Sequence, residues 1–184
     1  MRTTCGHPRG SSLIIVIIIV AFMLAVGVAM LVITGLAPKV SGSVRDQEAA
    51  FNAAEAGFDA ARVQIENNLL SGAWSGLTAY CLTTPTGIDN PLQTNYFRKQ
   101  SDTSLVQTLS AGTTGVLYYS QPYIKTTSGQ NDTSRTYTVF LINQGLASDA
   151  LLVSIGVAWS PGGQALATSR IEVDLGTESS GSAP

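Results

Sequence analysis

Apolar residues are distributed unevenly along the chain, with one long block near its N-terminus. No charged residue occurs from Leu13 to Leu36. A bilayer core of roughly 30 Å requires about 20 apolar residues in helical conformation, so this block is long enough to cross a membrane. Backbone polar groups in lipid must be satisfied within the segment, and residues 11–37 are therefore predicted to form a hydrophobic transmembrane helix.

A cleaved secretory signal is the alternative interpretation of the same block. The apolar region of such a signal has about 7–15 residues, far fewer than this one. Residues 1–10 are polar and contain Arg2 and Arg9, and basic residues before a span favour a cytoplasmic N-terminus. We therefore predict a single-pass membrane protein whose larger part lies outside the cytoplasm.

Small residues recur along the apolar block. Ala21, Ala25 and Ala29 are spaced by four residues and would form one stripe on a helix. Such stripes allow the close approach of two helices in a membrane. Composition bias alone gives the same pattern, and the sequence leaves both interpretations open.

An amphipathic pattern continues from the apolar block through residues 38–70. Its apolar positions recur at steps of three and four, as in a helix with one buried face. The predicted buried face comprises Phe51, Ala54, Phe58, Ala61, Ile65 and Leu69. The opposite, solvated face carries Glu48, Glu55, Asp59, Arg62 and Glu66. Gly57 lies among alanines, and we expect another element to pack closely there.

Beyond residue 70 the helical period ends and the content of Ser, Thr, Gly and Asn rises. The predicted strands are Gly115–Lys125, Thr136–Asn143, Ala150–Trp159 and Ala167–Leu175. Residues Ser160–Gly163 form a turn that joins the last two strands as a hairpin. Residues 71–175 are therefore predicted to be a β-rich globular head, with a disordered tail at 176–184. Ser104–Ser110 fits either a short strand or a short helix.

An antiparallel sheet with one apolar face needs a cover for that face. In Ala150–Trp159 the alternate residues from Leu151 to Trp159 are apolar and share one face. The long apolar stripe of the helix, Phe51–Leu69, is the available cover. We predict an α+β fold in which a long N-terminal helix packs on the C-terminal antiparallel sheet through its second half, while its first half spans the membrane.

The composition gives little support to catalysis or to nucleic-acid binding. Charged residues make up 12% of the chain and the net charge is −2, which provides no electrostatic reason for a nucleic-acid partner. The two cysteines, Cys5 and Cys81, form no CxxC motif, and His7 is the single histidine. We predict no metal, no cofactor, no catalytic residue and no enzymatic activity.

Two kinds of residue leave an alternative open. Cys81 is expected to be a small buried apolar residue, with a reactive or intermolecular thiol as the alternative. The aromatic residues of the head are expected in its core or on its sheet surface, with a carbohydrate-binding or adhesive role as the alternative. They include Trp74, Trp159 and the tyrosines at 118, 119 and 123.

Three segments in order make a family resemblance specific. A basic leader ends in Arg9-Gly10, the apolar helix follows at once, and residues 50–57 read AFNAAEAG. Together they resemble the N-terminal region of PilX-type minor pilins of type IV pili, over roughly the first third of the chain. The resemblance implies a pilin-like fold in the bacterial inner membrane, whose apolar helix bundles with those of other pilins and minor pilins in lipid or in a filament core.

The resemblance also implies processing of the leader. Prepilin peptidase would cleave between Gly10 and Ser11, and the new amine on Ser11 would be methylated. Major pilins begin the mature chain with phenylalanine, so Ser11 departs from their pattern.

A second departure concerns the fifth mature position. Major pilins carry a glutamate there, thought to pair with the terminal amine of a neighbouring subunit, but this chain has Ile15. The resemblance therefore implies a priming or tip-associated subunit rather than a repeated one. Alternatives are a type II secretion pseudopilin and a single-pass envelope protein with an adhesive β domain. A membrane-anchored enzyme is disfavoured, because no histidine follows the leader.

Overall fold

The computed structural model describes residues 11–125, 131–144 and 150–176, with their side chains except at 11–12, 32–40 and 124–125. The predicted leader and most of the predicted tail lie outside the described residues. The chain divides into two compact units, Met1–Gly42 and Ser43–Pro184. The second unit therefore includes the last part of the long helix as well as the strands.

Helix α1 spans Ser11–Leu70 and contains both predicted helical segments. It ends at Leu70, and Gly72 just beyond this end has a φ of +71°. Glycine adopts this left-handed conformation without the steric cost that other residues meet, and it commonly ends helices. The backbone N–H of Trp74 then donates to the carbonyl of Asn68 at 3.0 Å, which satisfies one of the last helical carbonyls.

Four strands form one antiparallel sheet in the order β1-β2-β3-β4. They are β1 (Val116–Lys125), β2 (Asn131–Asn143), β3 (Ala150–Trp159) and β4 (Ala165–Leu175). The α+β class and the helix-on-sheet arrangement are thus confirmed, although β2 begins at Asn131 rather than at Thr136. The predicted β3–β4 hairpin is also present: the Ser160 N–H donates to the Gln164 carbonyl at 2.8 Å.

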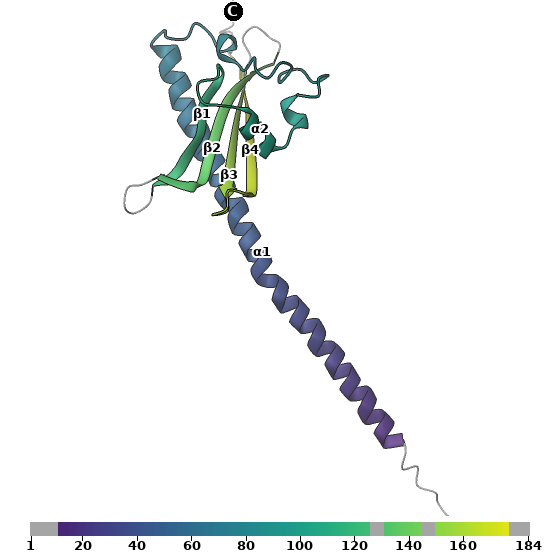
Figure 1. Cartoon of the computed structure of the whole chain (residues 1–184). Coiled ribbons are helices and arrows are strands. Elements are labelled where there is room, and N and C mark those ends of the chain that lie inside the picture. The colour runs from purple at the N-terminus through teal and green to yellow at the C-terminus, as the bar shows by residue number, and fades with distance from the viewer. Residues whose placement is uncertain (1–10, 126–130, 145–149, 177–184) are drawn as a thin grey trace, which may run out of the picture. The chain divides into compact units, whose positions relative to one another are not determined.

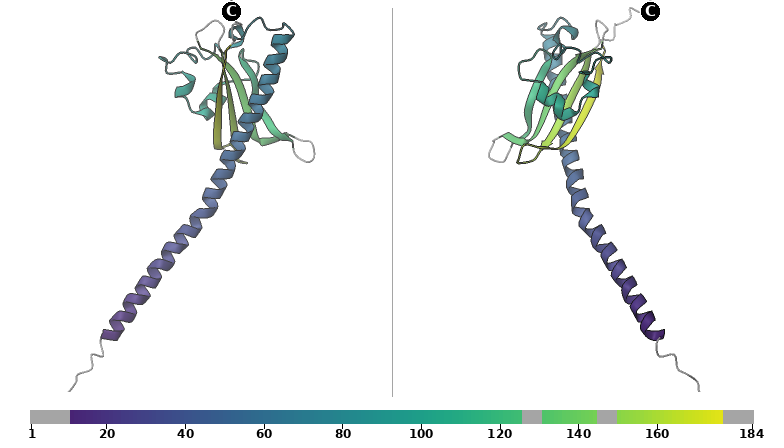
Figure 2. Two further views of the ribbon diagram at one scale, coloured as in Figure 1. Left: turned by 180° about the vertical axis from the view of Figure 1, so that it is seen from behind. Right: turned by 45° about the vertical axis from the view of Figure 1, so that its right-hand side comes forward.

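The sheet is covered on both faces, and this corrects the prediction of a single cover. The alternate apolar residues of β3, from Leu151 to Val157, do not face α1. They pack instead against buried side chains from residues 82–109, among them Leu82, Ile88, Phe97 and Leu105. Figures 1 and 2 show helix α2 (Asp102–Thr108) on this side of the sheet and the last part of α1 on the other.

At Ser154 and Gly156 of β3, the face of the sheet toward α1 consists of small residues. The Ser154 hydroxyl donates to the Ala54 carbonyl at 2.7 Å. A Cβ added at Gly156 would come within 2.5 Å of the Ala54 nitrogen. The backbones of α1 and β3 therefore approach each other closely, and only small side chains fit between them.

The predicted helix face is wrong at its ends. Ala54 and Ala61 are fully buried, but Phe51 is 45% exposed and Leu69 is 39% exposed. The buried stripe runs instead through Ala50, Ala54, Gly57, Ala61 and Ile65. The close contact with Gly156 is made by Ala50 and Ala54, and Phe51 lies beside this stripe rather than in it.

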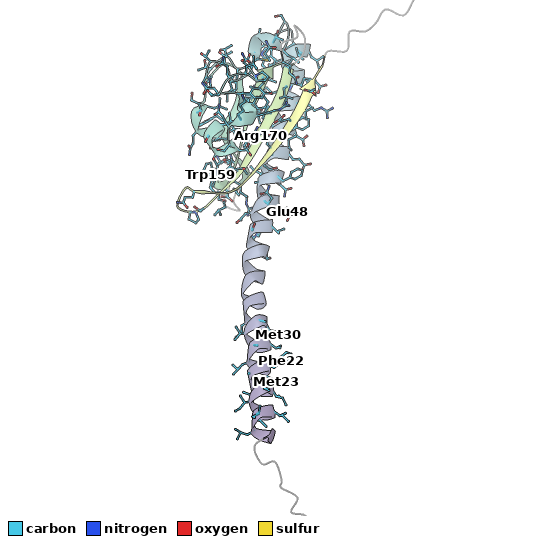
Figure 3. The ribbon with its side chains drawn as sticks, turned by 90° about the vertical axis from the view of Figure 1, so that its right-hand side faces the viewer. Phe22, Met23, Met30, Glu48, Trp159 and Arg170 are labelled. Carbon is cyan, nitrogen blue, oxygen red and sulfur yellow. The ribbon has the colours of Figure 1, made fainter. Side chains whose placement is uncertain are left out.

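Residues 82–109 form the second cover of the sheet, and charged side chains of β4 hold this cover in place. The Arg170 Nε donates to Asp102 Oδ1 at 2.7 Å, and the same guanidinium reaches the carbonyls of Phe97 and Gln100. Arg98 forms an ion pair with Glu172 at 2.6 Å. Figure 3 shows Arg170 on the strand beside this segment. The polar face of β4 thus anchors residues 97–102 as well as facing solvent.

Cys81 is buried, as expected, with 2% of its surface exposed. Its thiol donates to the Leu77 carbonyl at 3.5 Å. Burial raises the pKa of the Cys81 thiol to about 11, with a smaller contribution from Asp89. At neutral pH the thiol is therefore protonated, which disfavours the nucleophilic thiolate form.

The close helix–sheet contact predicts a specific sensitivity at Gly156. The change Gly156→Val should lower the free energy of unfolding of the full chain by at least about 2 kcal/mol, because the new side chain overlaps the backbone of α1. Denaturant unfolding of the detergent-solubilised protein, followed by tryptophan fluorescence, measures this change.

Gly162→Ala provides the matched control. A Cβ at position 162 would meet only the Ser160 hydroxyl, at 3.8 Å, so stability should stay within about 0.5 kcal/mol of the original. Equal stability of the Gly156→Val protein and this control would contradict the packing described here.

Candidate assembly surface on the N-terminal helix

The first unit presents an apolar helical surface that no described residue covers. The segment Leu13–Leu31 has 19 residues, and none of it is buried. At about 1.5 Å per residue it is roughly 29 Å long, close to the thickness of a bilayer core. Figure 3 shows the side chains of Phe22, Met23 and Met30 pointing away from the helix. A helix that is apolar on every side is typical of a membrane span or of the core of a helix bundle.

The sequence of this segment favours lipid over water as its surroundings. Residues 14–20 are all isoleucine or valine, and β-branched residues are weak helix formers in water. In lipid the need to satisfy every backbone group outweighs that preference. The same residues in water would expose a large contiguous apolar patch, which marks an interaction surface.

On two sides of this helix the side chains are short or absent. Ala21, Ala25 and Ala29 form one small-residue stripe, as the spacing predicts. Gly27 lies roughly 200° around the helix from Ala25, and a Cβ added there would meet nothing within 4 Å. A shallow apolar groove around Gly27 is lined by Ile19, Met23, Leu24 and Leu31, among others. The helix therefore offers two places where a neighbouring helix can approach closely.

The spacing of the alanines predicts the stripe, but no pattern in the sequence predicts the groove at Gly27. A single glycine produces no periodic signal, and its effect depends on the larger side chains above and below it. Glycine within an apolar span was the available clue, because it lets helix backbones approach.

Ile15 lies within the exposed apolar surface, with 56% of its area exposed. No acidic residue is present anywhere in Leu13–Leu31. The helix surface near its start therefore offers no carboxylate to a neighbouring positive charge. Of the predicted processing residues, Gly10 lies outside the described residues and Ser11 is the first residue of α1.

The remaining predicted packing residues belong to the second unit. A Cβ at Gly57 would lie 2.7 Å from the Ser154 hydroxyl and 2.8 Å from the Tyr137 ring. Phe58 is partly buried against the cluster that contains Ala61, Val139 and Leu152. Ala54, Gly57 and Phe58 thus hold α1 on the sheet and are separate from the apolar surface of the first unit.

The described residues contain no group of three or more His, Cys, Asp or Glu side chains that could hold a metal ion. The N-terminal surface itself has no side chain able to donate or accept a proton. What this surface can do is exchange contacts with lipid for contacts with other apolar helices.

Residues 9–59 match the family model described as PilX N-terminal. These residues are thus similar to that family and are referred to as the PilX N-terminal region. This match confirms the resemblance to PilX-type minor pilins over the apolar helix and AFNAAEAG, and it fits a membrane-anchored protein related to the type IV pilus. No curated protein and no solved structure matches the chain significantly. Strands β1–β4 lie outside the PilX N-terminal region.

The alanine stripe predicts that bulk at position 25 impairs assembly. Ala25→Leu should lower the amount of pili several-fold, because the larger side chain keeps neighbouring helices apart. The head should remain folded, which protease resistance of detergent extracts measures.

Val26→Leu is the matched control, since it introduces the same side chain on a different side of the helix. It should leave pilus numbers close to normal in electron micrographs. Normal piliation with Ala25→Leu would remove the argument that this stripe is a packing surface.

Proposed function

We propose that this chain is a minor pilin that acts in type IV pilus assembly as a priming or tip-associated structural subunit. The observation that carries the proposal is the exposed apolar helix within the PilX N-terminal region, with isoleucine at position 15. The subunit performs no reaction of its own. Its partners are prepilin peptidase and the N-terminal helices of other pilins and minor pilins.

Processing is the first step of the proposed function. Prepilin peptidase cleaves between Gly10 and Ser11 at the cytoplasmic side of the inner membrane, and the amine on Ser11 is then methylated. The mature chain begins with α1, so its first residues carry a positive charge beside an apolar surface. A small residue before the bond lets the protease approach the backbone closely.

Exchange of lipid for neighbouring helices is the second step. Lipid tails are about as apolar as the side chains of α1, so the hydrophobic effect gives little preference for the bundle. Association depends instead on close packing and on polar pairing. Here the alanine stripe and the groove at Gly27 provide the packing.

The isoleucine at position 15 restricts where the subunit fits. An unpaired charge within an apolar bundle is costly, so a terminal amine requires a carboxylate partner. This chain has an amine to donate but no carboxylate to receive the amine of a further subunit. A position at the tip or in an initiating complex does not need that second pairing.

The first test concerns processing. N-terminal mass spectrometry should find a mature chain that begins at Ser11 in cells with prepilin peptidase, and the full precursor in cells without it. Gly10→Leu should block cleavage, whereas Gly6→Leu, a matched change within the leader, should not. A protein that keeps its first ten residues in the presence of active peptidase would contradict the proposal.

The second test concerns copy number. The protein should be a minor component of sheared pili in quantitative mass spectrometry. Ile15→Glu should raise its abundance there several-fold, because it supplies the missing carboxylate, while the similarly sized Ile15→Gln should not. An abundance of the unaltered protein equal to that of the major pilin would refute the terminal position.

A further inference from the structure

A cleft lies at the end of the sheet where β3 is joined to β4. Its volume is about 550 Å³, and its lining includes Ser120, Asp132, Ser134, Thr136, Trp159 and Ser160. This size is within the range of about 300–1,000 Å³ usual for sites that hold small molecules. All of these residues lie outside the PilX N-terminal region, so the proposed pilin function does not account for the cleft.

Trp159 supplies the apolar wall of the cleft. The ring is partly buried against the core cluster of the second cover, and its Nε1–H donates to the Thr136 hydroxyl at 2.9 Å. Figure 3 shows Trp159 at the end of the sheet. The hydrogen bond and the core contact hold the ring in place, so this part of the cleft wall needs little ordering on binding.

Strand β1 is irregular where it borders the cleft. Ser120 has a φ of +45°, the one non-glycine residue with positive φ in the described structure. Its N–H donates to the Thr138 hydroxyl at 3.1 Å, and the pairing with β2 shifts register between Tyr118 and Gln121. Strained residues and bulges of this kind concentrate at binding sites, where they redirect side chains.

The polar part of the lining has one charged group. Asp132 accepts a hydrogen bond from the Ser134 N–H at 2.9 Å. Hydrogen bonds from Ser134 lower the pKa of the Asp132 carboxyl, so it is charged at neutral pH. The other polar lining groups named above are hydroxyls. An anionic ligand would therefore be repelled, while a ligand rich in hydroxyl groups would find both donors and acceptors.

We propose that this cleft binds a neutral sugar residue of a glycan. A pyranose has one face of C–H groups, which suits the aromatic Trp159 side chain, and a rim of hydroxyls, which suits Asp132 and the neighbouring Ser and Thr residues. The cleft gives the head a second, recognition role that is independent of its part in assembly. Loss of sugar binding would therefore leave processing and pilus assembly unchanged.

The test uses the mature full chain in a detergent without a sugar headgroup. Methyl glycosides of glucose, galactose, mannose, N-acetylglucosamine and N-acetylgalactosamine are titrated up to about 10 mM, since single sugars bind weakly. Isothermal titration calorimetry should show saturable binding of at least one of them. Methyl glucuronide, which carries a carboxylate, should bind at least tenfold more weakly.

Three variants locate the binding. Trp159→Leu should weaken it at least tenfold, and Asp132→Asn, at a surface position that leaves the core intact, should weaken it several-fold. Trp74→Phe is the matched control, because Trp74 stacks on Tyr80 away from the cleft at a ring distance of 4.3 Å, and binding should be unchanged. Binding of no neutral sugar, preference for the glucuronide, or equal affinity of the Asp132→Asn protein and the original overturns the proposal.

Discussion

The apolar surface of Leu13–Leu31 has to be covered by something other than water. Every large side chain of this segment is exposed, and no other described part of the chain covers it. Lipid can cover the whole circumference, and so can a ring of similar helices. Because these two environments differ little in polarity, small differences in packing or in charge pairing decide between them. The alanine stripe, the groove at Gly27 and the absence of a carboxylate at position 15 gain their importance from this balance.

The second unit covers its apolar faces with its own residues. Its sheet has two buried faces, and each receives a different kind of cover. On one face, small residues of α1 contact Ser154 and Gly156, and the backbones of α1 and β3 approach each other closely. Residues 82–109 supply bulky side chains to the other face. Arg170 and Arg98 then tie the second cover to β4 by charged hydrogen bonds. The end of α1 is thus an integral part of the head rather than a linker to it.

Much of this architecture could be predicted from the sequence, because periodicity reports burial. Alternation in Ala150–Trp159 and Ala167–Leu175 identified strands, and steps of three and four identified the helix. Residues 71–114 carry no such period, so the second cover was missed and α1 was assigned to the wrong face of β3. Phe51 was placed in the buried stripe because it is apolar and has helical spacing, whereas the residues that contact the sheet there are the small Ala50 and Ala54. The cleft at Trp159 unites residues from three strands, a juxtaposition that no local pattern reports.

In the proposed function, the N-terminal helix leaves lipid to pack against other pilin helices. Site-specific photo-crosslinking tests it most directly, with the photoreactive residue at position 25 and with position 26 for comparison. In piliated cells we expect protein crosslinks from position 25 that map to the N-terminal helices of other pilins or minor pilins. Crosslinks to lipid alone from position 25, in cells that assemble pili normally, would contradict it.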